Sequence, residues 1–190
     1  MVIFVMDKTK YLMALVLMGY MGSGKTSHCK RLANRLKVPR FDLDLEIERF
    51  AKASVSEIFA QSGESVFRDL EQRMLRKVLN DEFKVLALGG GTPCFHDNMA
   101  VIKDRAFSVY LKMEPKLAFK RLKFAKIGRP LIEEKGDEEL ESFVKKQIEE
   151  RAPFYNQADM IVDADKINAA TLDKIKEGYD DWAEKKFQLK

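Results

Sequence analysis

The chain has 190 residues, of which 46% are hydrophobic and 34% charged, and this composition predicts one globular domain over residues 1–190. Its net charge of +4 comes from 34 basic and 30 acidic residues without a Lys/Arg block, which argues against nucleic acid and favours small anionic ligands. No apolar run is long enough to span a membrane. The two cysteines, Cys29 and Cys94, lie far apart outside any CxxC pattern, which argues against a disulfide or zinc site and predicts a cytoplasmic protein.

The first twelve residues form an extension whose character the sequence leaves open. They begin apolar, but Asp7 and Lys8 interrupt the run and no small-residue cleavage site follows, so a signal peptide is not expected. The segment is either an extra edge strand or an upstream addition to a core that begins near Met13.

Beyond this extension, short apolar runs alternate with longer amphipathic ones. The apolar runs have the length of strands buried on both faces, and they cover residues 14–18, 39–43, 85–88, 107–111 and 160–162. The amphipathic segments have helical spacing, and they cover residues 25–36, 64–79, 117–124, 137–151 and 167–187. A capping-box pattern from Ser54 to Glu57 predicts one more short helix. This alternation predicts an α/β fold with a parallel sheet, which binds ligands at the carboxyl ends of its strands.

The first predicted strand leads into GYMGSGKT, residues 19–26, a complete GxxxxGK[ST] phosphate-binding loop. Its glycines let consecutive N–H groups turn toward an anion, and the following helix adds the positive end of its dipole. Lys25 is expected to reach the β- and γ-phosphates, and the Thr26 hydroxyl is placed to bind Mg²⁺. The loop predicts a nucleoside triphosphate site with contacts from Gly22, Ser23, Gly24, Lys25, Thr26 and Ser27.

The third predicted strand ends at three consecutive glycines, Gly89, Gly90 and Gly91. Such a run marks either a tight turn or a backbone that closely approaches a bound molecule, and Gly90 is expected to need room for that approach or a positive φ. The triphosphate already has its own loop, and a parallel sheet brings both loops to the same edge. We therefore expect a second ligand beside the γ-phosphate.

Five charged residues are candidates for binding or reaction at this edge. Asp42 and Asp44 close the second predicted strand on one side of it, where they could hold metal-bound water and a substrate hydroxyl; surface charge at a helix start is the alternative. Arg68 lies among acidic residues, a pattern more typical by itself of a surface ion pair. Arg129 lies in a stretch with glycine and proline that is expected to be a mobile loop, and Arg151 lies near a helix end.

Taken in order, these motifs resemble those of the shikimate kinase family. The resemblance covers residues 15–163 and rests on GYMGSGKT, FDLD, GESVFRDLE, LGGG, GRPL and RAPFYNQAD. It implies a P-loop kinase like the nucleoside monophosphate kinases, with a five-stranded parallel sheet of order 2-3-1-4-5 flanked by helices and a mobile lid at about residues 123–137. The implied reaction transfers the γ-phosphoryl group of ATP to the 3-hydroxyl of shikimate, in aromatic amino-acid biosynthesis.

The resemblance implies roles on the substrate side of the site. Asp44 binds shikimate hydroxyls and is the candidate catalytic base. Arg68 and Arg151 pair with the shikimate carboxylate, which suits bidentate guanidinium groups. The backbone of Gly89, Gly90 and Gly91 contacts the ring hydroxyls, with Gly90 at the centre.

Other implied roles concern the phosphates. Lys25 and the lid residue Arg129 neutralise charge during transfer, together with Mg²⁺. Thr26 binds that ion, and Asp42 reaches it through water. ATP and shikimate are then the expected partners of a chain that acts as a monomer.

Two features are not explained by the family pattern. The glycines are followed by TPCFHDN, which leaves a supporting role open for Cys94, His96 or Asn98, although structural or surface roles are simpler. Arg121 could stack on adenine, but a charged residue on a helix face is the simpler interpretation.

Three alternatives remain at this point. One is another small-metabolite kinase of the same fold, such as a gluconate kinase. LGGG and the pair Arg68 and Arg151 argue against it, because they favour a carboxylated cyclic polyol as substrate. A nucleotide kinase is disfavoured because no base-reading segment is apparent. A P-loop binding module without catalysis is disfavoured by the intact Lys25 and Asp44.

Overall fold

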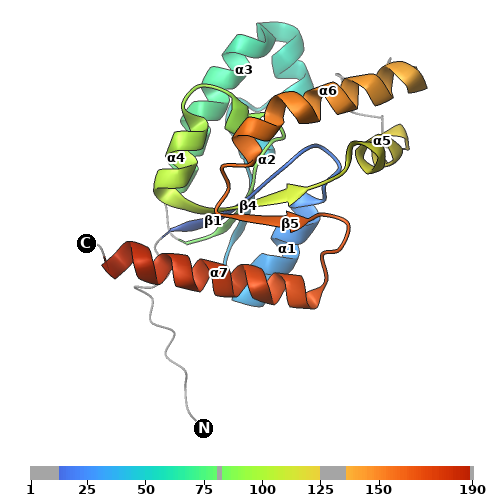
Figure 1. Cartoon of the computed structure of the whole chain (residues 1–190). Helices are drawn as coiled ribbons and strands as arrows, with labels where there is room; N and C mark the ends of the chain where they lie inside the picture. The colour runs from blue at the N-terminus through green and yellow to red at the C-terminus, as the bar shows by residue number, and fades with distance from the viewer. Residues whose placement is uncertain (1–12, 81–82, 125–135, 189–190) are drawn as a thin grey trace.

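The computed structural model describes residues 13–80, 83–124 and 136–188. Its five strands form one parallel sheet of order β2-β3-β1-β4-β5, as the sequence predicted (Figure 1). The strands are β1 (Ala14–Met18), β2 (Arg40–Asp42), β3 (Val85–Ala87), β4 (Ala106–Lys112) and β5 (Met160–Asp163). The predictions for residues 1–12 and for the lid residue Arg129 lie outside the described residues.

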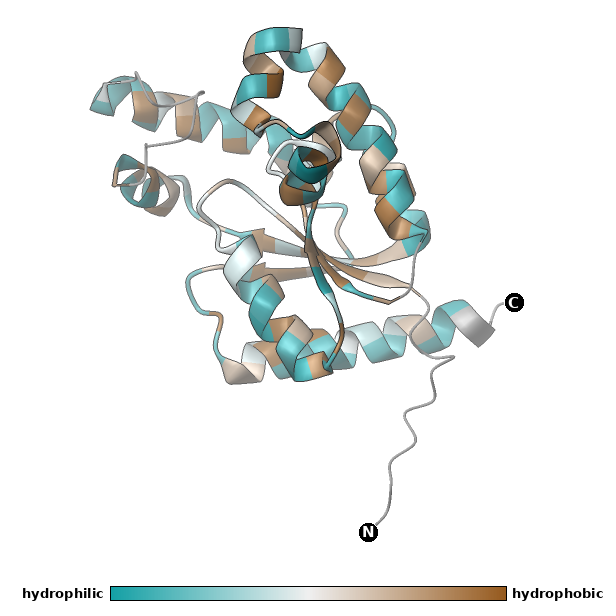
Figure 2. Ribbon diagram, turned by 180° about the vertical axis from the view of Figure 1, so that it is seen from behind, coloured by the Kyte–Doolittle hydropathy of each residue, from teal (hydrophilic) through white to brown (hydrophobic). Residues whose placement is uncertain are grey.

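Helices cover both faces of this sheet (Figure 1). They are α1 (Lys25–Leu36), α2 (Leu43–Ala51), α3 (Val55–Leu79), α4 (Asn98–Arg105), α5 (Pro115–Lys123), α6 (Asp137–Tyr155) and α7 (Ala169–Gln188), with a 3₁₀ turn at Thr92–Cys94. None of the helices within the described ranges is long and apolar enough to cross a membrane. In Figure 2 the helices alternate teal and brown residues along their length, whereas the central strands are mostly brown.

The side chains of the central strand β1 alternate between two hydrophobic cores, one on each face of the sheet. Leu15 and Leu17 belong to a cluster with α1 and α7, whereas Val16 and Met18 belong to a cluster with α2, α3 and α4. Successive side chains of a strand point to opposite faces, so a strand buried on both sides must be apolar throughout. Burial of β1 on both faces places the P-loop, which follows Met18, at the centre of the sheet edge.

Several helix boundaries differ from the sequence prediction. The predicted strand 39–43 ends at Asp42, and α2, which the sequence analysis did not identify, begins at the next residue. The short helix α4 was also missed, because its eight residues are too few to show a clear repeat. Helix α6 continues past Pro153 to Tyr155, although a proline inside a helix removes one backbone hydrogen bond and crowds the carbonyl group of the preceding turn.

The capping box at Ser54 is confirmed, and it opens the first arm of α3. Ser54 Oγ accepts from the backbone N–H of Glu57, and the Glu57 carboxylate accepts from the N–H of Ser54. Gly63, with φ 78° and ψ 172°, breaks the helical backbone of α3, so the two helices predicted before and after it are confirmed as its two arms. The kink separates a first arm beside the site from a longer arm that carries Arg68.

Candidate active site

The P-loop connects β1 to α1. Gly22 and Gly24 adopt φ values of 82° and 86°, which side-chain-bearing residues rarely take. Gly24 caps α1, whose first residue is Lys25. Lys25 Nζ donates to the carbonyl oxygens of Gly19 at 2.9 Å and Tyr20 at 3.1 Å, so the lysine lies folded over its own loop. Ser23 is fully buried, while Thr26 and Ser27 lie exposed on the first turn of α1.

Asp42 connects the P-loop helix to the start of α2. Its Oδ2 accepts from Thr26 Oγ1 at 2.8 Å, and its Oδ1 accepts from the backbone N–H of Asp44 at 3.2 Å. Asp42 is therefore the N-cap of α2, and Asp44 lies in the first helical turn. The expectation that both aspartates share one side of a strand is wrong, because the strand ends at Asp42. Both carboxylates nevertheless line the same cavity.

Asp44 is buried among other acids. Burial raises its pKa from 3.8 to about 6, and the negative charges of Asp42, Glu71 and Glu48 add to that effect, while the charge of Lys25 opposes it. Its carboxyl therefore titrates close to neutral pH, as suits a group that accepts a proton during a reaction.

Arg68 lies on the second arm of α3 and is only 8% exposed. Its Nε and Nη2 donate to Glu64 Oε1 at 3.2 and 3.0 Å, and its Nη1 donates to Glu71 Oε2 at 2.9 Å. The sequence interpretation of an ion-paired residue was right about the pairing, but the arginine is buried at a cavity wall rather than on the surface.

Glu71 holds the glycine loop as well as Arg68. It is fully buried, and its Oε1 accepts from Thr92 Oγ1 at 2.6 Å. The carbonyl oxygen of Thr92 accepts from Asn98 Nδ2 at 2.9 Å. One carboxylate thus connects the arginine with the turn after the triple glycine, and Asn98 has the structural role that the sequence analysis preferred.

Side chains of the site crowd the two ends of the triple glycine, while the approach of its backbone to a bound molecule stays a prediction. A Cβ atom on Gly89 would lie 2.7 Å from Asp44 Oδ1, and one on Gly91 would lie 2.9 Å from Arg68 Nη2. At Gly90 the nearest atom would be Arg151 Nη1 at 3.4 Å, an ordinary contact, and its φ is not in the left-handed region. The positive φ considered for Gly90 is therefore wrong.

Arg151 lies on α6, on the other side of the triple glycine. Its guanidinium carbon is 5.5 Å from the centre of the Tyr20 ring, within range of a cation–π contact. One turn further on, the buried Tyr155 hydroxyl donates to the carbonyl oxygen of Gly90. Helix α6 thus positions the arginine and fixes the central glycine of the loop at the same time.

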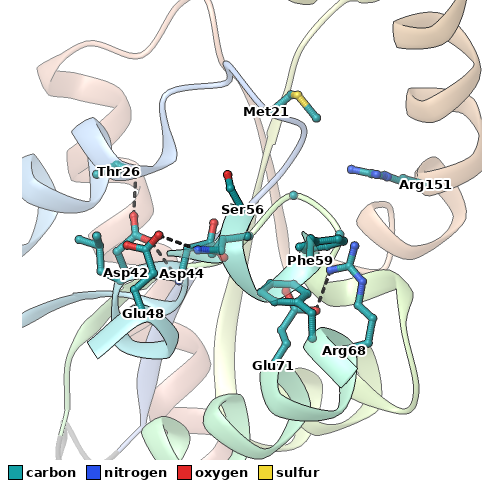
Figure 3. A pocket seen from close by; sticks show the side chains of 16 residues that line it. Met21, Thr26, Asp42, Asp44, Glu48, Ser56, Phe59, Arg68, Glu71 and Arg151 are labelled. Carbon is teal, nitrogen blue, oxygen red and sulfur yellow. Dashed lines mark hydrogen bonds and ion pairs between the residues drawn. The ribbon is translucent and has the colours of Figure 1, made fainter. Parts of the chain in front are cut away.

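These residues surround a cavity of about 520 Å³ beside the P-loop (Figure 3), a size within the roughly 300–1,000 Å³ of small-molecule sites. In Figure 3 the aspartates lie on one side of the cavity and the two arginines on the other. The predicted site residues that line it are Thr26, Asp42, Asp44, Arg68, Gly89, Gly90, Gly91 and Arg151. Gly22, Ser23, Gly24, Lys25 and Ser27 belong to the P-loop and the first turn of α1.

The cavity wall also contains residues that the sequence analysis did not assign to the site. They are Met21, Leu45, Glu48, Val55, Ser56, Phe59, Phe67 and Glu71. Phe67 belonged to the helical stripe of 64–79 and looked like a core residue, and Phe59 had no pattern of its own. Glu71 was noted only as an acidic neighbour of Arg68, and a buried carboxylate cannot be distinguished in sequence from an exposed one.

The remaining candidates have other surroundings. Burial raises the pKa of the Cys94 thiol to about 11, so it stays protonated at neutral pH. His96 is exposed, with Nε2 3.3 Å from Asp69 Oδ1. Arg121 donates to the carbonyl oxygen of Gly22 at 3.0 Å and pairs with Asp165 at 3.2 Å, so it ties α5 to the P-loop; contact with adenine stays a prediction.

A P-loop that adjoins a cavity with opposed carboxylates and guanidinium groups defines an ATP-dependent kinase for a small anionic molecule. Comparison with known families narrows this class. The family described as shikimate kinase matches residues 21–179. The chain belongs to the shikimate kinase family, whose members use ATP with a divalent metal ion. Membership decides against the gluconate kinase, nucleotide kinase and non-catalytic alternatives.

Individual relatives agree with this assignment. The shikimate kinase of Bacteroides thetaiotaomicron is 44% identical over 153 residues, which cover 80% of this chain and 87% of the relative. The crystal structure of shikimate kinase from the same organism superposes with a TM-score of 0.80 at 39% identity, covering 90% of this chain and 98% of the other. Shikimate kinase from Acinetobacter baumannii, solved in complex with shikimate, has a TM-score of 0.75 at 31% identity, covering 95% and 93%.

Proposed function

We propose that this chain phosphorylates shikimate from ATP in the cavity beside the P-loop, with ATP held by the loop and shikimate held between Asp44 and the two arginines. The observation that carries the proposal is the arrangement of Asp44, Arg68 and Arg151 around one cavity next to the glycine loop. Shikimate is an anion with three hydroxyl groups. It needs positive charge at one end and hydrogen-bond acceptors at the other, and the cavity offers both.

Asp44 acts as the base for the substrate hydroxyl in this proposal. With a pKa of about 6, its carboxylate is largely ionised at neutral pH yet basic enough to accept the proton as the hydroxyl attacks the γ-phosphorus. The bond between the γ-phosphorus and its bridging oxygen breaks as the new bond to the hydroxyl oxygen forms, and ADP leaves. Lys25, the last loop residue before Thr26 and the first residue of α1, neutralises charge on the transferred group.

Arg68 and Arg151 bind the substrate carboxylate. An arginine carries five N–H donors, and the three bonds of Arg68 to Glu64 and Glu71 leave one N–H on each terminal nitrogen. Two such donors suit the two oxygens of a carboxylate. Glu64 is exposed, so solvent screens its charge and weakens its competition with the substrate for the guanidinium.

Mg²⁺ is the divalent ion that we propose for this site. The Thr26 hydroxyl and the Asp42 carboxylate lie 2.8 Å apart at the start of α1, and oxygen donors of this kind, used together with substrate phosphates, suit Mg²⁺. The ion would screen the phosphate charge. We further propose that Arg129 closes over the phosphates from a lid, and that the chain works as a single-domain monomer in the cytoplasm without nucleic-acid or membrane partners.

The experiment is a coupled assay of ADP release with shikimate, gluconate and nucleoside monophosphates as separate acceptors. Release that depends on shikimate and is absent with the other acceptors is expected. Turnover with gluconate and none with shikimate would refute the proposal. Asp44→Asn provides the matched control, because it keeps the size of the side chain but removes the base.

A further inference from the structure

Phe95 lies against Arg68 from outside the cavity. The guanidinium carbon of Arg68 is 3.9 Å from the centre of the Phe95 ring, against 5.1 Å for Phe67 and 5.8 Å for Phe59. Phe59 and Phe67 line the cavity, whereas Phe95 is not among its lining residues. A ring face within about 6 Å of a guanidinium attracts it through the ring quadrupole. Phe95 is therefore the closest aromatic partner of the arginine and leaves its cavity side open.

The two residues after Phe95 attach this segment to α3. His96 Nε2 lies 3.3 Å from Asp69 Oδ1. Asp97 pairs with Arg76 Nη2 at 2.6 Å and accepts from Gln72 Nε2 at 2.8 Å. The partners on α3 all come after Arg68 in the sequence. The 3₁₀ turn before Phe95 is held to the same helix, because Thr92 donates to Glu71. The backbone on both sides of Phe95 is thus held to α3 by contacts that do not involve the ring.

We propose that Phe95 is a positioning residue for shikimate binding, which acts by stacking on Arg68 and holding its guanidinium plane toward the cavity. This inference rests on the proposed function, in which Arg68 binds the substrate carboxylate. Phe95 itself does not touch the substrate.

The bonds of Arg68 explain why a stacked ring is needed. Glu64 and Glu71 bind the guanidinium at its edges. Bonds in the plane restrain where the group lies but resist tilting of the plane less well, and a bidentate contact to a carboxylate depends on that plane. A ring at stacking distance restrains the tilt. Loss of the ring should weaken capture of the carboxylate while phosphoryl transfer from bound substrate continues.

The test measures steady-state kinetics of Phe95→Ala, Phe95→Leu and Phe95→Tyr. We expect Phe95→Ala to raise the shikimate KM about 2- to 30-fold, the range of a cation–π contact, with kcat and the ATP KM changed by less than about twofold. Phe95→Tyr keeps the ring face, so its shikimate KM should stay near that of the wild type. Phe95→Leu keeps an apolar side chain without that face, so its shikimate KM should be raised as in Phe95→Ala. If Phe95→Leu behaves like the wild type, stacking is not the cause and the proposal fails.

A matched control exists on α2. Phe50 is 61% exposed, its ring lies 6.0 Å from Lys77 Nζ, and neither residue is among those that line the cavity. Phe50→Ala removes the same side chain from a similar pairing and should leave the shikimate KM unchanged. Thermal melting of each variant shows whether it is folded. If Phe95→Ala does not fold, the comparison of Phe95→Tyr with Phe95→Leu decides the proposal alone.

A double-mutant cycle with Arg68→Gln separates this proposal from the one on which it rests. Shikimate dissociation constants are measured by calorimetry for the wild type, the two single variants and the double variant. If Phe95 acts through Arg68, Phe95→Ala should change affinity by less than about twofold once Arg68 is replaced. An undiminished effect of Phe95→Ala in that background overturns the positioning role only. Unchanged affinity of Arg68→Gln itself overturns the carboxylate clamp and this inference together.

Discussion

Replacement of Asp44 by asparagine should stabilise the folded protein while it removes the catalytic base. The reason is that Asp44 lies buried among the carboxylates of Asp42, Glu71 and Glu48, which raises its pKa to about 6. A buried acid whose pKa is raised on folding binds its proton more tightly in the folded state. Its ionisation therefore opposes folding, and a neutral side chain of the same shape avoids that opposition.

The sign and size follow from the two pKa values. Well below pH 3.8 the carboxyl is protonated in the folded and the unfolded chain, so Asp44 and asparagine should give similar stability. Stability of the wild type falls relative to Asp44→Asn as the pH rises from 3.8 to about 6, and the difference then stays constant. A gap of about two pKa units corresponds to about 3 kcal/mol. The advantage of Asp44→Asn should be about 1 kcal/mol at pH 4.5 and about 3 kcal/mol at pH 8.

Urea unfolding of wild type and Asp44→Asn at a series of pH values between 4.5 and 8 measures this difference, since groups that do not interact with Asp44 contribute equally to both proteins. Asp97 gives a control of opposite sign: its ion pair with Arg76 lowers its pKa, so Asp97→Asn should lose stability at neutral pH and lose less as the pH falls. If the advantage of Asp44→Asn is the same at every pH, or if the variant is less stable at pH 8, the burial argument for Asp44 is refuted.

Three further changes test the site. Arg68→Ala should weaken shikimate binding by about 30- to 1,000-fold with ATP binding near normal, which calorimetry measures; unchanged affinity would return Arg68 to a purely structural role. Gly91→Ala should raise the shikimate KM because the added methyl group meets Arg68, and Gly89→Ala should lower kcat because its methyl group meets Asp44. Gly90→Ala should change the KM and kcat less than these two variants do, and a larger effect at Gly90 would contradict the contact geometry. Arg129→Ala should lower kcat by about 10²-fold with the shikimate KM moved by less than tenfold, and wild-type kcat would remove Arg129 from the mechanism.

The sequence was most informative for features that depend only on residues close together in the chain. The strand β1 is apolar at every position because both of its faces are buried, and that continuity is visible without a structure. The P-loop needs its glycines and lysine at a set spacing, because a backbone that curls around an anion tolerates few side chains. The strand order and the cavity residues Asp44, Arg68 and Arg151 followed from motifs whose order resembles a family, rather than from residue chemistry alone.

The errors were also physical. Asp42 and Asp44 were placed on a strand, because alternation over three residues cannot be distinguished from the start of a capped helix. Gly90 was expected to need room for a bound molecule or a positive φ, and the positive φ is absent. Which glycine faces which side chain depends on where α3 and α6 pack against the loop.

Sequence by itself determined the fold class, the phosphate loop and the identity of the charged groups. Each of these can be recognised from the spacing of residues within short segments of the chain and from the order of those segments. Tertiary structure alone decided the environment of those groups. It buries Glu71 between Arg68 and Thr92, raises the pKa of Asp44 chiefly by burying it and also through the charges of Asp42 and Glu71, and places Phe95 on the guanidinium of Arg68. Burial and electrostatic coupling depend on distances between residues far apart in the chain, and only the packed fold sets those distances.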